Sequence, residues 1–148
     1  MVEFRPATPA DLPSLLDLLR ELNPDDPELA SADAVEIWTE IQANRRIGFF
    51  VALDAGLVVG TCHVAVVPNL TRSGRPYAVI ENVVVAKSHR RAGVGRKLTD
   101  LAIDFARSQA CYKVMLLSSA KRTEAHRFYE SIGFDGSSKQ GFVLQLRE

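Results

Sequence analysis

Apolar residues recur at helical spacing in the first third of the chain. Thr8, Pro9 and Asp11 form a helix start, because a hydroxyl precedes a proline and a carboxylate follows three residues later. Leucines at spacings of three and four then predict one buried helix face: Leu12, Leu15, Leu16, Leu19 and Leu22. Ser31 is expected to cap a second helix. The apolar side of that helix carries Ala34, Ile37, Trp38 and Ile41.

Beyond residue 47 the pattern changes to runs of β-branched and aromatic residues, which favour strands. With a short strand at the start of the chain, the predicted strands cover 2–7, 47–54, 57–67, 77–86, 112–118 and 141–146. Two helices separate the last three strands: one over 94–109, and a shorter one that starts at 123 and ends at Gly133. The longer helix has Leu98, Leu101, Ala102 and Phe105 on one face.

This order of elements predicts an α/β fold of the α+β type. The central sheet is mixed and mostly antiparallel, with helices on both faces. A right-handed helical crossover should make the strand at 112–118 parallel to the strand at 77–86. The C-terminal half then follows a β-α-β-α-β order. Because the 148 residues contain no repeat or linker, we expect one domain over 1–148.

The charges cancel over the whole chain, with 18 basic and 18 acidic residues. No general attraction to nucleic acid or membrane is therefore expected, and no apolar run reaches the roughly 18 residues of a membrane span. Cys62 and Cys111 are too few for a disulfide framework. His63, His89 and His126 are too scattered for a metal site. We expect a cytoplasmic protein without a metal.

One local segment departs from this balance. Five basic residues and no acidic residue lie at the turn that leads into the helix over 94–109: Lys87, Arg90, Arg91, Arg96 and Lys97. A helix that begins near Val94 directs unpaired N–H groups at this turn, and Gly93 and Gly95 allow a ligand to approach the backbone. The turn is typical of a phosphate or pyrophosphate site.

Known phosphate loops narrow this interpretation. A dinucleotide-binding loop needs a third glycine where this chain has Leu98, and a Walker loop needs Gly-Lys-Ser/Thr where Arg96 follows Gly95. The pattern that fits is Arg-x-x-Gly-x-Gly, carried by Arg90, Gly93 and Gly95. A solvated basic turn with glycines for backbone geometry is the alternative.

Two separate stretches resemble the GNAT superfamily of N-acetyltransferases. "IENVVVAKSHR" with "RAGVGRKL" is similar to its acetyl-coenzyme A motif, and "EAHRFYESIGF" to its second motif. "IENVVV" and "ACYKVMLL" resemble, more loosely, the small glucosamine-phosphate acetyltransferases. One departure is Arg122, which occupies a position where many members have an asparagine that contacts the cofactor arm.

The resemblance implies acetyl-coenzyme A (acetyl-CoA) as the co-substrate. Its pyrophosphate would bind the amides between Arg91 and Lys97, and its pantetheine arm would pair along the strand at 83–85 of a splayed sheet. The cofactor-binding residues implied are Val83, Val84, Val85, Arg90, Arg91, Gly93, Val94, Gly95, Arg96 and Lys97. Backbone amides near Val83 to Val85 would hold the oxyanion.

Two side chains are candidates for catalysis. Tyr129 would give a proton to the leaving thiolate, although an aromatic residue on this helix also suits a core position. Glu81 lies inside a strand, where a carboxylate is costly unless paired or used. It would accept the amine proton through water, or it would be the partner of a buried basic side chain.

The function expected is acetyl transfer from acetyl-CoA to a primary amine of a small molecule or peptide. A non-catalytic acyl-CoA sensor is the alternative, to which Arg122 lends its only support. Acidic residues in and between the first two helices favour a cationic amine: Asp25, Asp26, Glu28, Asp33 and Glu36. Arg72 and Arg75 favour a phosphorylated or carboxylated amine instead, and both sets also serve solubility. A homodimer through the β-rich C-terminus is compatible with the pattern.

Overall fold

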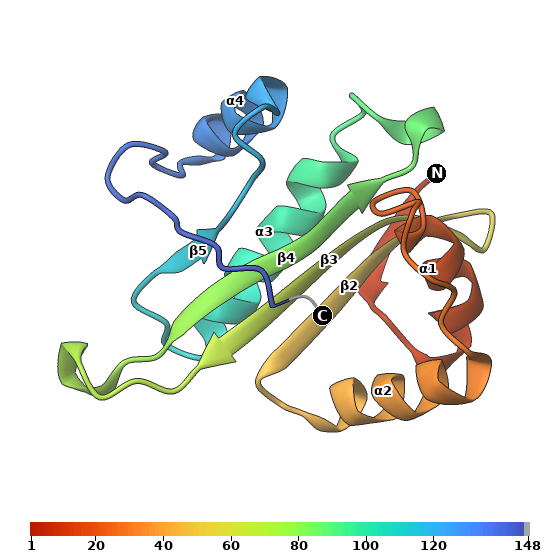
Figure 1. The fold of residues 1–148 in the computed structure, drawn as a ribbon, viewed down its shortest axis with the longest axis horizontal. Coiled ribbons are helices and arrows are strands. Elements are labelled where there is room, and N and C mark those ends of the chain that lie inside the picture. Colours follow the sequence, from red (N-terminus) through yellow and green to blue (C-terminus); the bar gives the residue numbers. More distant parts are fainter. Residues whose placement is uncertain (147–148) are drawn as a thin grey trace.

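The computed structural model describes residues 1–146 and shows a five-stranded sheet with helices on both faces (Figure 1). The strands are β1 (Glu3–Pro6), β2 (Ile47–Asp54), β3 (Leu57–Val67), β4 (Tyr77–Val85) and β5 (Val114–Leu116). The helices are α1 (Leu12–Leu19), α2 (Ser31–Ala43), α3 (Val94–Ser108) and α4 (Thr123–Ile132). Short 3-10 turns cover Pro9–Asp11, Arg72–Gly74 and Lys87–His89.

The sheet follows the order β1-β2-β3-β4-β5. The first four strands are antiparallel neighbours, and β5 is parallel to β4 after the α3 crossover. The predicted mixed sheet and the parallel pair are therefore confirmed.

Each face of the sheet has its own core. On one face α3 buries Leu98, Ala102 and Ala106 against side chains such as Phe50 and Ile80. On the other face α1 and α2 cover a second cluster, which contains Leu15, Leu18, Trp38, Phe49 and Val51. Alternate residues of β2 and β3 point into the two cores, as the geometry of a strand requires. The predicted helices on both faces of the sheet are therefore confirmed.

A partly buried ion pair holds the start of α1 on the sheet. Arg5 of β1 donates two hydrogen bonds to the Asp11 carboxylate, at 2.7 and 2.9 Å. The backbone N–H of Thr8 donates to the same carboxylate at 2.7 Å. Asp11 is 6% exposed, and the guanidinium beside it lowers the pKa of its carboxyl to about 2.

A β-bulge changes the side-chain pattern of β4 in its middle. Thr61 pairs with Val84 and His63 with Glu81, so β4 has one residue more than β3 over this stretch. Asn82 takes a left-handed conformation there, with φ +54°. As a result, Ile80 faces the α3 core whereas Val84 faces the α1 core.

From Glu81 onward, the edge of β4 that faces away from β3 has no neighbouring strand. Only Ala78, Val79 and Ile80 pair with β5, although β4 continues to Val85. The two strands therefore separate after Ile80, and the splay that the family resemblance implied is present. The β4 backbone from 81 to 85 has one side without a neighbouring strand.

Several expected details are wrong. Residues 141–146 form no strand; the segment crosses the molecule in an extended path, and Phe142, Leu144 and Leu146 are exposed. This apolar run pairs with no strand edge in the described part of the chain, so it makes no ladder. The strand expected over 112–118 covers only 114–116, because the chain leaves β4 where the splay begins.

The expected helix starts and faces also need correction. Ser31 is the first residue of α2 rather than its cap, and Ala30 occupies the cap position without a side-chain bond. Ile37, expected on the buried side of α2, is exposed. Leu18 is buried in α1 although it lay outside the predicted leucine stripe. Leu15 and Leu18 both pack against the sheet, so they define the buried face of α1.

Candidate functional site

The turn before α3 has the backbone of an anion site. Arg91 and Gly93 are both left-handed, with φ +62° and +79°. The backbone N–H groups of residues 91–93 make no hydrogen bond within the described part of the chain, and those of Val94, Gly95 and Arg96 open the helix. Successive unpaired N–H groups at a helix start form a concavity that attracts phosphate oxygens.

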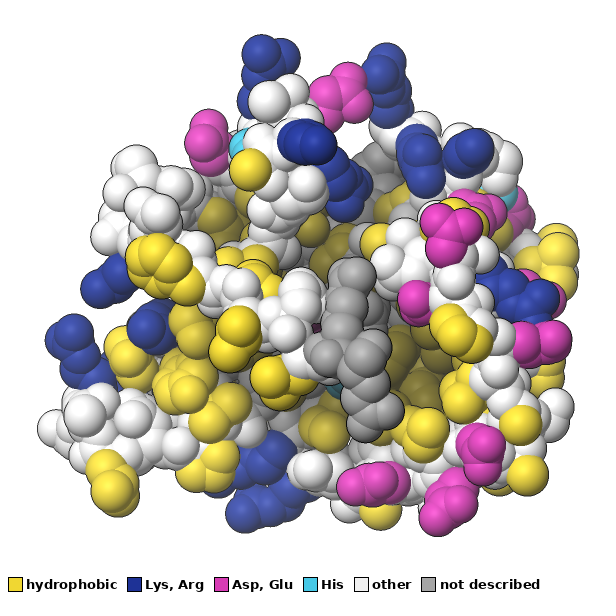
Figure 2. Space-filling model, in the orientation of Figure 1, with side chains coloured by type: hydrophobic (Ala, Val, Ile, Leu, Met, Phe, Trp, Pro, Cys, Tyr) yellow, Lys and Arg dark blue, Asp and Glu magenta, His cyan; other side chains and the backbone are white. Residues whose placement is uncertain are grey.

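The basic side chains of this turn have different neighbours. Arg90 donates from Nε to the Val85 carbonyl at 3.0 Å, and Lys97 lies 4.7 Å from the centre of the Phe4 ring. Arg91 makes a long, exposed ion pair of 3.4 Å with Glu124. Basic side chains gather along the upper edge of the face in Figure 2, over α4 and the loop that leads into α3. The positive charge is thus local, although the chain as a whole is neutral.

A second contact fixes the chain just before this turn. His89 Nε2 lies 2.6 Å from a carboxylate oxygen of Asp54, in the hairpin between β2 and β3, and His89 Nδ1 lies 2.7 Å from Ser88 Oγ. This hydrogen bond holds the pKa of the Asp54 carboxyl below its usual range. The hairpin therefore anchors the end of β4, where the turn before α3 begins.

A pocket of about 250 Å³ lies where β4 and β5 separate. Its walls come from the turn after α1, the bulged part of β4, the end of β5 with the chain that follows it, and α4. They are formed by Leu22, Asn23, Ile80, Glu81, Asn82, Val83, Leu116, Leu117, Ser118, Ser119, Arg122 and Tyr129. Both predicted catalytic residues, Glu81 and Tyr129, are therefore on the wall of one cavity.

Tyr129 is half-buried on the side of α4 that faces this pocket. Its ring packs edge-on against Phe128, with ring centres 5.1 Å apart, and against Phe134 at 5.8 Å. Burial raises the pKa of the Tyr129 phenol, whereas the positive charge of Arg122 acts to lower it. A phenol in this setting is protonated at neutral pH and is able to donate.

Glu81 is exposed to the pocket rather than buried. It makes no ion pair with any residue between 1 and 146, so the expectation of a structural pair with a basic side chain is wrong. The bulge at Asn82 follows it directly, and the side chain emerges on the α1 face of the sheet opposite His63. Its exposure removes the cost that a carboxylate in a closed core would carry.

The valines expected along the cofactor arm do not share one environment. Val83 lines the pocket and, with Val85, packs at the margin of the α3 core. Val84 is 6% exposed and belongs to the α1 core. Any contact from Val84 to a ligand in the splay would therefore have to come from its backbone.

The turn and the pocket are neighbours. A side chain added at Gly95 would touch the Phe128 ring at 3.4 Å, and Phe128 packs on Tyr129. Val94 beside it, the first residue of α3, is 3% exposed and packs in the core between α3 and the sheet. An extended ligand bound at the turn could thus reach the pocket along the free side of β4.

Sequence reasoning missed most of the pocket wall, including the polar residues Asn82 and Ser118. Asn82 had a signal, because asparagine is rare inside strands but tolerates left-handed backbone. Ser118 had none. Its hydroxyl is buried on the pocket wall and has no hydrogen-bond partner within residues 1–146.

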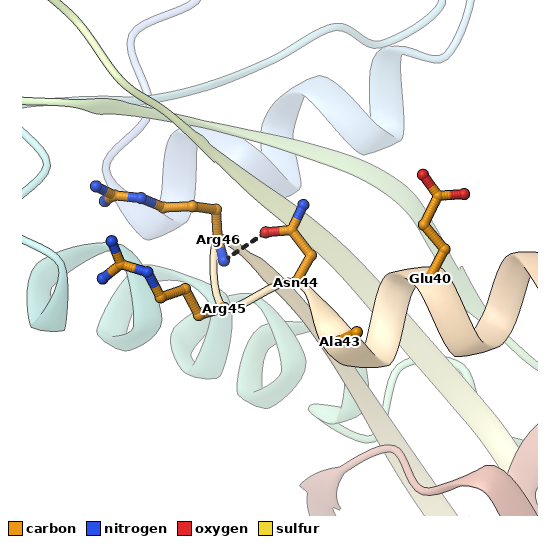
Figure 3. Close-up of a pocket in the computed structure, with 5 residues that line it drawn as sticks. All are labelled: Glu40, Ala43, Asn44, Arg45 and Arg46. Carbon is orange, nitrogen blue, oxygen red and sulfur yellow. Dashed lines mark hydrogen bonds between the residues drawn. The ribbon is translucent and has the colours of Figure 1, made fainter.

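A larger but shallow hollow of about 500 Å³ lies at the end of α2 (Figure 3). Glu40, Ala43, Asn44, Arg45 and Arg46 line it, and the backbone N–H of Arg46 donates to Asn44 Oδ1 at 2.9 Å. No predicted site residue contributes to this hollow. We therefore place the candidate site in the smaller pocket of the splay.

Two further features bear on function. Among residues 1–146 no group of His, Cys, Asp and Glu side chains is arranged to hold a metal ion. Over the same range, no helix combines the length and apolar character needed to cross a membrane.

Comparison with known proteins gives the class that this fold and site define. The chain is 36% identical over 143 residues to glucosamine 6-phosphate N-acetyltransferase of Trypanosoma brucei brucei, covering 94% of this chain and 92% of that protein. It superposes on a solved Trypanosoma brucei acetyltransferase with a TM-score of 0.85 at 33% identity, over 98% of this chain and all of the other. Aminoglycoside N-acetyltransferase AAC(6')-Iy, solved in complex with CoA, shares the fold at 17% identity, with a TM-score of 0.83 and coverage of 99% and 96%.

The profile of the Acetyltransferase (GNAT) family matches residues 12–134. The chain therefore belongs to this family. The expected family, fold and enzyme class are confirmed: this is an N-acetyltransferase. The alternative, a non-catalytic acyl-CoA sensor, receives no support from these comparisons.

Proposed function

We propose that the protein transfers the acetyl group of acetyl-CoA directly to a primary amine in the pocket between β4 and β5. The observation that carries this proposal is the position of Glu81 and Tyr129 on the wall of one pocket beside the unpaired N–H groups of residues 91–93. A thioester, an amine, a proton acceptor and a proton donor can meet there.

The residues present fit coenzyme A. The left-handed turn and the α3 start offer N–H groups to a pyrophosphate, and Arg91 and Arg96 add exposed positive charge. The side of β4 without a neighbouring strand offers backbone groups to the amides of the pantetheine arm. A neighbour of the same fold was solved with CoA, which supports this assignment.

Acetyl-CoA supplies an activated acetyl group when bound, and the protein would supply proton transfer and orientation. Glu81 takes the proton of the attacking amine, directly or through one water molecule, because its carboxylate is exposed to the pocket. Tyr129 gives its proton to the departing sulfur. The backbone N–H groups beyond the bulge, near Val83 to Val85, stabilise the oxyanion.

For the acceptor we propose a small amine that carries a phosphate, with glucosamine 6-phosphate as the first candidate. The 36% identity to a glucosamine 6-phosphate N-acetyltransferase supports this substrate. The arginines of the 68–76 loop support it less, since Arg75 donates to the carbonyls of Ala110 and Cys111 and Arg72 lies over the Tyr112 ring. Those side chains are occupied by the scaffold.

We also propose that two copies pair through their C-terminal parts. Phe142, Leu144 and Leu146 are more than four-fifths exposed, at 86%, 84% and 91%. A second copy would cover them. The cytoplasmic location, the single domain and the lack of a nucleic-acid or membrane partner stay predictions.

The test is release of free thiol from acetyl-CoA in the presence of an amine panel that contains glucosamine 6-phosphate, polyamines and amino acids. Tyr129→Phe should lower kcat about a hundredfold at saturating acetyl-CoA without changing the fold. Tyr112→Phe is the matched control and should leave kcat unchanged. Wild-type protein that releases no thiol with any amine would refute the proposal.

A further inference from the structure

Arg122 places a positively charged side chain on the pocket wall, and the proposed reaction gives it no role. It precedes α4 by one residue, and its backbone is fixed: its N–H donates to the Ser119 carbonyl at 3.0 Å, and its carbonyl accepts from the His126 N–H at 3.2 Å. Within residues 1–146 its guanidinium makes no ion pair. It lines the same cavity as Tyr129 and Glu81.

The neighbours of Arg122 limit what it can do. Glu81 is the only carboxylate on the described wall of this pocket, and it does not pair with Arg122. Arg122 and Tyr129 line the same pocket and lie seven residues, about two helical turns, apart along α4. The Tyr129 phenol is therefore the acidic group that the charge of Arg122 reaches, and this charge favours its negative form. Ser118 adds a buried hydroxyl without a partner to the same wall.

We infer that Arg122 stabilises the negative charge that appears beside it when Tyr129 gives up its proton during acetyl transfer. This inference rests on the proposed function. The amine nitrogen bonds to the acetyl carbon, the carbon–sulfur bond breaks, and its electron pair stays on sulfur. The sulfur takes the phenol proton, Glu81 takes the amine proton, and solvent returns a proton to the phenolate.

The charge of Arg122 opposes the effect of burial at the moment when burial is most costly. A half-buried phenolate is poorly solvated and therefore costly to form. This cost raises the barrier to proton transfer from Tyr129 unless a positive group is near. An arginine keeps its charge at the pH of the reaction. An asparagine, the residue that many family members carry here, could not provide this charge, so Arg122 acts through Tyr129 in a way that an amide cannot.

A titration that needs no turnover tests this directly. The phenolate absorbance of Tyr129 is obtained as the difference between a protein and the same protein with Tyr129→Phe. In Arg122→Gln the midpoint of this difference titration should rise by about half to one pH unit. Arg127→Gln, on the exposed side of the same helix, is the control and should leave the midpoint unchanged.

Arg122→Lys separates charge from shape. Near pH 7.5 its lysine is charged, so it should retain most of the wild-type kcat. Arg122→Gln should lose about threefold to tenfold in kcat while its Kd for CoA stays unchanged.

The outcomes are distinct. An unchanged titration in Arg122→Gln overturns this inference and leaves the proposed function intact. A loss of activity that is matched by a weaker Kd for CoA also overturns it, because Arg122 would then bind the cofactor arm. Inactive wild-type protein refutes the proposed function instead.

Discussion

Replacing Asp11 by asparagine should reveal how much the ion pair under α1 contributes to stability. The Arg5 guanidinium and the Thr8 N–H bind the charged form of this buried carboxyl and lower its pKa from 3.8 to about 2. At about 1.4 kcal/mol per pH unit, this fall corresponds to about 2.5 kcal/mol of stability. Asp11→Asn should therefore lower the free energy of unfolding at pH 7 by about that amount.

The effect has a definite dependence on pH. Because the pKa is lowered in the folded state, the contribution is complete above the unfolded pKa of about 4 and is lost as the pH falls toward 2. The difference between wild type and Asp11→Asn should thus be constant from pH 7 to 5 and fall to about half at pH 3.

Urea unfolding followed by Trp38 fluorescence measures this difference. Trp38 is the only tryptophan, is 5% exposed and packs edge-on against Phe49 with ring centres 5.0 Å apart, so its emission reports unfolding. Asp17→Asn, at an exposed position of α1, is the matched control and should cost little. A loss below about 0.5 kcal/mol, or a loss that stays constant down to pH 3, would contradict the reasoning.

Three further predictions concern backbone and thiols. Gly93→Ala should lower the free energy of unfolding by about 1 kcal/mol and weaken the binding of CoA measured by calorimetry. Gly56→Ala, at a similar left-handed φ in a remote turn, should lose as much stability and bind CoA normally. Equal binding by the two variants would count against a phosphate site at the turn before α3. Asn82→Val should lower the stability in urea by about 1–2 kcal/mol, whereas Asn82→Gly should be tolerated; equal losses would rule out strain at the bulge. Burial raises the pKa of the Cys62 thiol to about 12, so in a Cys111→Ser background it should react with a thiol reagent at pH 8 only after unfolding, and rapid reaction of the native protein would contradict its burial.

The sequence predicted those features that depend on repeating patterns. The helical stripe of α3 and the β-branched runs of β2 and β3 are buried as expected, because these patterns come from local geometry. The glycine turn was also predictable, since Gly93 adopts the left-handed backbone for which glycine is suited. Its proximity to Tyr129 was implied by the family resemblance rather than by spacing.

The features that were missed depend on tertiary partners. The run at 141–146 has strand propensity, but a strand also needs an edge with which to pair. Glu81 lies inside an apolar run, yet the bulge and the splay expose it to a pocket. The short β5 reflects the departure of the chain from β4 rather than the composition of 112–118.

The narrow junction between β4 and β5 has a consequence for how the molecule moves. The two strands share three residue pairs, and α4 contains no fully buried residue, so the segment that carries Tyr129 is attached to the sheet by few contacts. Amide hydrogens of residues 117–132 should therefore exchange faster than those of β2 and β3 in the free protein. On the proposed function, a ligand lying between the strands would bridge them and slow this exchange, so the acetyl donor would itself steady the helix that completes its reaction.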